Sequence, residues 1–154
     1  WSSDVCSSDL DVLRGSSLLR EEERICREKA REALDFVGLS HIAHRLAGDV
    51  TQEERKRVAF ALALATDPRL MLLDEPAGGV NPEETEGLAE LIRKIVRHGI
   101  TVALIEHKMN MIMSLADKIL VLSYGEKIAE GTPEEIRRNP AVIDAYLGSE
   151  HADA

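Results

Sequence analysis

The chain has 154 residues, a formal net charge of −9 and an isoelectric point of about 5.1. An acidic protein has no general attraction for nucleic acid or anionic lipid. With 3% aromatic residues it also offers few rings on which bases can stack. No apolar run approaches the roughly 20 residues of a membrane-spanning helix, and neither cysteine has metal-ligand spacing. We therefore expect a reduced, cytosolic compartment and no nucleic-acid partner.

Residues 1–10 (WSSDVCSSDL) follow neither a helical nor a strand period. The chain also begins with Trp1 rather than Met. We interpret residues 1–10 as a non-native, adapter-like segment and leave them out of the fold prediction. The alternative interpretation is a natural disordered linker.

Helical signals dominate the first half of the chain. Spaced apolar residues predict an amphipathic helix over residues 19–37, and Gly38 is placed to end it. Thr51 and Glu54 form a capping box that opens a second helix, which Asp67 and Pro68 end.

The second half alternates strands and helices. The expected strands cover residues 70–73, 101–105, 118–122 and 127–129. The expected helices cover residues 82–98, a short stretch around 109–115, and two short segments that begin at Pro133 and Pro140. The first strand is apolar throughout, which is typical of a strand buried on both faces, and we expect the second to be buried as well. This order predicts an α/β fold with a mostly parallel sheet.

Candidate chemistry follows the strand over residues 70–73. Asp74 and Glu75 are adjacent carboxylates at its carboxyl end, where ligands of open α/β sheets bind. One carboxylate can hold Mg²⁺ and the other can orient or deprotonate a water molecule. His107 follows the next strand and can reach a γ-phosphate there. The alternatives are a solvated acidic turn and a structural or surface histidine.

Several stretches, taken in order, resemble ABC ATPases. They are residues 57–65 with Asp67-Pro68 (signature helix), Asp74-Glu75-Pro76 (Walker B), residues 77–81 (D-loop) and Ile105-Glu106-His107 (H-loop). Residues 131–148 are similar to the tail of branched-chain amino acid transporter ATPases. The resemblance implies the C-terminal half of a P-loop NTPase domain, with a mostly parallel sheet, flanking helices and the end of a helical subdomain. The implied divisions are residues 11–49 for the end of the helical subdomain, 50–148 for the ATPase part with its tail, and 149–154 for a disordered tail.

The resemblance also implies roles for individual residues. Asp74 would hold Mg²⁺, Glu75 would polarise the attacking water, and His107 would sense the γ-phosphate. Asn81 would lie at the interface between two ATPase subunits, where the signature of one subunit faces the nucleotide of the other. Thr51, Gln52 and Glu53 occupy the signature positions.

Two departures from the family pattern bear on activity. Gln52 and Glu53 stand where the family has glycines, whose absence hinders close approach of the backbone to phosphate, and Leu62 stands where it has arginine. No glycine is followed by lysine, so the phosphate-binding G-x-x-x-x-G-K-[ST] motif is absent. We expect ATP and Mg²⁺ to be cofactors of a full-length protein and this polypeptide to be inactive in isolation.

By resemblance, the protein is the ATP-hydrolysing subunit of an importer for branched-chain amino acids, on the cytoplasmic face of the cell membrane. Its partners would be transmembrane permease subunits and a second, identical or different ATPase subunit. Importers of amides or urea are an alternative. A different class of function is a non-hydrolytic ABC-like interaction or regulatory module. An ABC ATPase of DNA repair is disfavoured by the acidic charge and the transporter-like tail.

Overall fold

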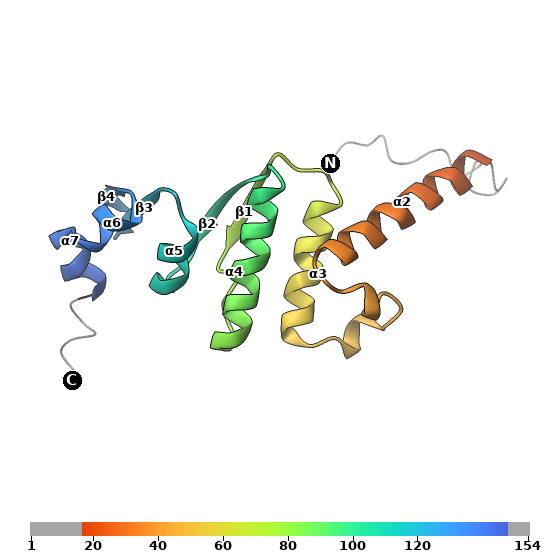
Figure 1. Ribbon diagram of the computed structural model, residues 1–154, viewed down its shortest axis with the longest axis horizontal. Helices are drawn as coiled ribbons and strands as arrows, with labels where there is room; N and C mark the ends of the chain where they lie inside the picture. Colours follow the sequence, from red (N-terminus) through yellow and green to blue (C-terminus); the bar gives the residue numbers. More distant parts are fainter. Residues whose placement is uncertain (1–16, 148–154) are drawn as a thin grey trace. The chain divides into compact units, whose positions relative to one another are not determined.

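The computed structural model describes residues 17–147, which form two compact units that divide between Met71 and Leu72. Figure 1 traces the elements of both units along the chain. The predicted adapter-like segment (1–10) and the tail beyond residue 148 lie outside the described residues. Within residues 17–147, no helix is long and apolar enough to cross a membrane.

The first unit is built on two packed helices, α2 (Ser17–Phe36) and α3 (Gln52–Leu64), joined by the short 3-10 turns η2 (Ser40–Ile42) and η3 (Ala47–Asp49). Gly38 ends α2 as the sequence predicts, with φ at 79°. Its N–H donates to Asp35 O at 3.0 Å, and the Leu39 N–H donates to Leu34 O at 2.8 Å. This pair of bonds is the Schellman arrangement, in which glycine takes the left-handed position without a Cβ penalty.

Both helices of the first unit and the connection between them contribute buried residues. They are Ala33, Val37, Leu39, Ile42, Phe60 and Ala61. Apart from Phe60 these side chains are aliphatic, and burial of this apolar area is what holds α3 against α2.

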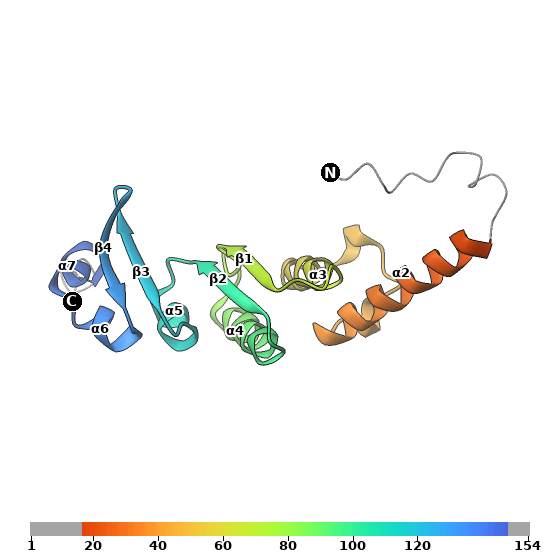
Figure 2. The same cartoon turned by 90° about the horizontal axis from the view of Figure 1, so that it is seen from above.

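A β–α–β arrangement follows, made of β1 (Leu70–Asp74), α4 (Pro82–Arg97) and β2 (Thr101–Ile105). The division between the units falls within β1, and the rest of this arrangement belongs to the second unit. β1 pairs with β2, and Figure 2 shows both arrows pointing the same way, so the pair is parallel with α4 as the crossover. The apolar face of α4 is buried through Leu88, Ala89, Leu91, Ile92 and Ile95. The predicted strands and crossover helix are therefore confirmed.

The expectation that these strands are buried on both faces is wrong. Leu72 is 73% exposed in β1 and Ile105 is 67% exposed in β2. The reason is that α4 lies on one side of the β1–β2 pair (Figure 1 and Figure 2), and no described element covers their outward-facing side chains. An apolar sequence shows that both faces of a strand could be buried. Whether they are buried depends on which other elements pack against the strand.

The rest of the second unit contains α5 (Met109–Leu115), a hairpin of β3 (Ile119–Ser123) and β4 (Glu126–Gly131), and the short α6 (Pro133–Arg137), α7 (Pro140–Val142) and η4 (Ile143–Leu147). β3 and β4 are antiparallel, with an irregularity after Val121. Tyr124 and Gly125 join them with φ of 48° and 83°, which matches the twist of a two-residue hairpin. A small apolar core lies between hairpin and helices, formed by Ile119, Ala129, Ile136 and Val142.

The strands among residues 17–147 thus form two pairs, one parallel and one antiparallel. Helices alternate with strands along the second unit, so the predicted α/β class is confirmed.

Candidate functional site

Glu75 lies directly after β1 in a tight turn. Its backbone N–H donates to Ile105 O at 2.9 Å, which continues the pairing with β2 by one residue. Its φ is 43°, a left-handed conformation that costs a non-glycine residue about 1–3 kcal/mol. The Gly78 N–H closes the turn on Glu75 O at 3.0 Å, and a Cβ on Gly78 would lie only 3.2 Å from that oxygen. The glycine therefore permits the turn that ends the strand with an exposed carboxylate.

Asp74 is the last residue of β1 and is exposed. Its carboxylate makes no hydrogen bond or ion pair within residues 17–147. That part of the chain also holds no group of three or more His, Cys, Asp or Glu side chains able to bind a metal ion. Magnesium is commonly bound by one or two carboxylates, with water and substrate phosphates as its other ligands. A lone carboxylate at a strand end fits this pattern when phosphates are present.

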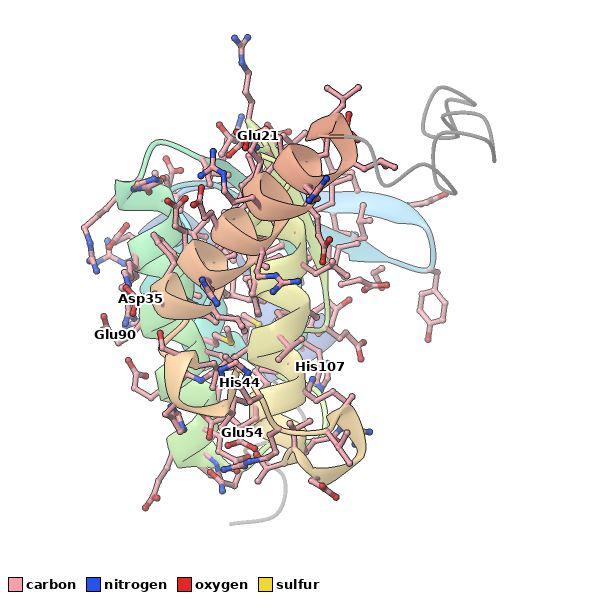
Figure 3. All side chains as sticks on the ribbon, turned by 90° about the vertical axis from the view of Figure 1, so that its right-hand side faces the viewer. Glu21, Asp35, His44, Glu54, Glu90 and His107 are labelled. Atoms are coloured by element: carbon pink, nitrogen blue, oxygen red, sulfur yellow. The ribbon has the colours of Figure 1, made fainter. Side chains whose placement is uncertain are left out.

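His107, labelled in Figure 3, lies just beyond β2 and beside Glu75. The distance from His107 Nδ1 to Glu75 Oε1 is 3.6 Å, and both side chains are well exposed. This is longer than a direct hydrogen bond. The structure therefore brings together the two residues for which the sequence predicts catalytic roles.

Glu106 is a site residue that sequence reasoning missed. Its side chain has 0% exposure, and its oxygens accept from three backbone N–H groups. The Ala77 N–H donates to Oε1 at 2.9 Å, and those of His107 and Lys108 donate to Oε2 at 3.1 and 3.3 Å. A buried carboxylate is tolerated when it is hydrogen-bonded in this way. The one sequence signal was a glutamate between an apolar strand and the candidate histidine.

Lys108 holds the same loop from the other side of His107. Its Nζ donates to Ala77 O at 2.8 Å, to Thr85 Oγ1 at 3.0 Å and to Val80 O at 3.4 Å. All three ammonium protons thus have acceptors, two in the connection from β1 to α4 and one in the first turn of α4. Nothing in the local sequence pattern predicts this contact.

Asn81 occupies the N-cap position of α4. Its Oδ1 accepts from the Glu84 N–H at 2.8 Å, and Glu84 Oε2 accepts from the Asn81 N–H at 3.0 Å. Pro82 follows at the first helical position. The side chain that the resemblance would place at a subunit interface has a local role in starting the helix.

The remaining candidate residues lie in the first unit, at the start of α3. Thr51 is the N-cap: its Oγ1 accepts from the Glu54 N–H at 3.1 Å, and Glu54 Oε2 accepts from the Thr51 N–H at 2.7 Å. The second of these bonds, with a smaller contribution from Arg45, lowers the pKa of Glu54 below its usual value. The capping box predicted from the sequence is confirmed.

Two arginines offset the acidic side chains near this helix start. Glu53 pairs with Arg57 at 2.8 Å, and Glu54 pairs with Arg45 at 3.2 Å. Arg57 also donates to Val37 O at 3.3 Å, which ties the pair to the end of α2. Gln52 begins the helix and is exposed. The three signature positions thus form one group in the first unit, whereas the residues after β1 and β2 belong to the second.

Two family models match the chain. The model described as ABC transporter matches residues 3–78, and the model described as branched-chain amino acid ATP-binding cassette transporter matches residues 126–152. Together they cover more than half of the chain, and the second falls on the tail for which the sequence predicts this subfamily.

Curated relatives agree with these models. The chain is 46% identical over 130 residues to the high-affinity branched-chain amino acid transport ATP-binding protein BraF of Pseudomonas aeruginosa, covering 84% of this chain and 51% of BraF. It is 43% identical over 122 residues to LivG of Escherichia coli strain K12, covering 79% of this chain and 48% of LivG. The chain spans about half the length of the curated relatives it matches.

A solved structure agrees as well. The ADP conformation of MJ1267, an ATP-binding cassette of an ABC transporter, superposes with a TM-score of 0.75 at 31% identity, covering 92% of this chain and 57% of that one. On its sequence and its fold, the chain belongs to the family of ABC transporter ATP-binding proteins.

Proposed function

We propose that this chain supplies the hydrolytic face of the ATP site in an importer for branched-chain amino acids. The observation that carries the proposal is the placement of Glu75 and His107 at neighbouring strand ends, 3.6 Å apart, with Asp74 adjacent. The names of BraF and LivG and the match of the tail support the solute class.

Each residue has a distinct task in this proposal. The Glu75 carboxylate accepts a hydrogen bond from the attacking water and takes up its proton as the water attacks the γ-phosphorus, with ADP as leaving group. His107 would donate a hydrogen bond to a γ-phosphate oxygen and help to stabilise the charge that develops there. Asp74 holds Mg²⁺, directly or through water, and the ion neutralises phosphate charge when bound.

The start of α3 would serve the nucleotide of a second ATPase subunit. Backbone N–H groups of Gln52 and Glu53 lie at the helix N-terminus, where anions are favoured. The pairing of Glu53 with Arg57 reduces the repulsion that its carboxylate would otherwise exert on phosphate. Asn81 would lie at the interface between the two subunits, and this arrangement suits a homodimer and a heterodimer equally.

Solute passage would require transmembrane permease subunits, with this chain bound at the cytoplasmic face of the cell membrane. ATP-binding subunits do not contact the solute, so importers of amides or urea are the nearest alternative to branched-chain amino acids.

Because the chain lacks G-x-x-x-x-G-K-[ST], we also propose that it neither binds ATP tightly nor hydrolyses it in isolation.

The experiment is a transplant of residues 17–147 into BraF in place of the matching segment. BraF then supplies the rest of the cassette, and ATP binding and turnover are compared with those of BraF. We expect the hybrid to bind ATP and to hydrolyse it. A hybrid that binds ATP and shows no turnover would contradict the proposal.

The alternative, a non-hydrolytic interaction or regulatory module, draws support from the start of α3. There Glu54 accepts from the Thr51 N–H, so a carboxylate of the protein already occupies part of the helix N-terminus. The same hybrid separates the two functions, because this alternative predicts binding without turnover.

A further inference from the structure

Ala77 is held by side chains from both sides of His107. It has 0% exposure, and its two backbone polar groups are both bound by side chains. Its N–H donates to Glu106 Oε1 at 2.9 Å, and its carbonyl accepts from Lys108 Nζ at 2.8 Å. Glu106 and Lys108 are the immediate neighbours of His107. One residue of the loop after β1 is therefore fixed by the two residues that flank the histidine.

The contacts of Glu106 join two stretches of backbone. One carboxylate oxygen binds the loop after β1, and the other accepts from the N–H groups of His107 and Lys108. Because this side chain is fully buried, separating the two stretches would leave a desolvated charge without its partners. Motion of the two stretches as one body should therefore cost less free energy than their separation.

Lys108 extends the connection along the loop to α4. Besides Ala77 it binds Val80 O and Thr85 Oγ1, which lie on either side of the N-cap Asn81. The backbone around His107 is thus tied to the whole loop, while the His107 side chain is left exposed and near Glu75.

We propose that Glu106 and Lys108 are positioning residues that couple His107 to the loop of residues 75–81. Displacement of this loop would then carry His107 with it and preserve the His107–Glu75 spacing. Both residues act through His107, whose Nδ1 lies 4.0 Å from Glu106 Oε2, and the catalytic meaning of the coupling rests on the function proposed above.

Hydrogen exchange of the 154-residue chain without nucleotide tests the coupling. The variants are E106Q and K108M, with K127M as the matched control, since Lys127 pairs with Glu130 on the exposed surface of the hairpin. The amide of E106Q has one acceptor oxygen and can serve one stretch of backbone but not both. K108M removes the ammonium and keeps an unbranched side chain of similar length. Circular dichroism compares the helix content of all four proteins.

We expect E106Q to speed exchange of the Ala77 amide, or of the His107 and Lys108 amides, by roughly tenfold, the loss due to one charge-assisted hydrogen bond. K108M should speed exchange of the Ala77 amide as well, although that amide donates to Glu106 and not to Lys108. Exchange in the buried part of α4, residues 88–95, should stay as in K127M. A merely structural loss would speed exchange there too.

The proposal is overturned if K108M leaves the Ala77 amide as protected as in K127M, or if E106Q leaves all three amides unchanged. It is also overturned if α4 exchanges faster to the same degree. The hydrogen-exchange experiment uses no nucleotide. A BraF hybrid without turnover would therefore contradict the proposed function but would not change the measured coupling.

Discussion

Asn81 offers a test that separates a local structural role from a catalytic one. In the capping box its Oδ1 accepts a hydrogen bond from the Glu84 N–H, and Glu84 Oε2 accepts one from the Asn81 N–H. N81A removes the first bond and leaves a first-turn N–H without its side-chain acceptor, which typically costs about 1 kcal/mol. N81G should cost only a few tenths of a kcal/mol, because water and the backbone compensate better there. N81S should be close to the native protein, since serine is an equivalent cap.

The assay is urea unfolding of the chain at low protein concentration, followed by circular dichroism. The order of midpoints should be native, N81S, N81G and N81A, with an unchanged slope against urea. If N81A unfolds with the native midpoint, the cap does not hold α4 and the structural account of this residue fails. In the BraF hybrid, a drop in turnover for N81S, whose cap is intact, would show a role beyond capping.

Three further predictions concern the core, the exposed strand face and the hairpin. I95A should lower the free energy of unfolding by about 2–5 kcal/mol because Ile95 has 0% exposure, whereas V96A, at 46% exposure, should lower it far less; equal losses in urea unfolding would refute this packing. L72K should reduce concentration-dependent association measured by light scattering, because Leu72 is 73% exposed on an uncovered strand face; unchanged scattering would place association elsewhere. Hydrogen bonds and charges, first from Lys118, lower the pKa of Glu130 to about 2 from 4.5. A carboxyl group whose pKa is lower in the folded than in the unfolded state stabilises the fold at pH values above its unfolded pKa. This stabilisation should therefore be lost as the pH falls from 4.5 to about 2. In an NMR titration K118M should raise the pKa of Glu130, and an unaltered pKa would remove Lys118 as the cause.

Local signals were the most predictable part of this fold. Gly38, Thr51 and Asn81 end or begin helices through bonds to residues within five positions, so their neighbours in sequence suffice to predict them. The placement of His107 near Glu75 follows from a general property of parallel strands, whose carboxyl ends meet at one edge.

Two features that depend on distant parts of the chain could not be predicted from the sequence. Leu72 and Ile105 are apolar whether or not an element covers them, so their exposure depends on the surroundings of the strands. In the sequence alone, nothing distinguishes Glu106 from other polar residues that follow a strand. Its importance comes from the Ala77 N–H, 29 positions away, which only the folded loop brings to its carboxylate.

The central claim is that Glu75 performs the hydrolytic step, and ATP turnover by the BraF hybrid carrying E75Q tests it most directly. The matched control is E83Q, which removes the same charge from an exposed position in the first turn of α4. The account predicts that E75Q lowers turnover by roughly 100-fold or more while ATP still binds, since a positioned general base contributes about 10²–10⁴-fold. Turnover in E75Q equal to that in E83Q would contradict the account.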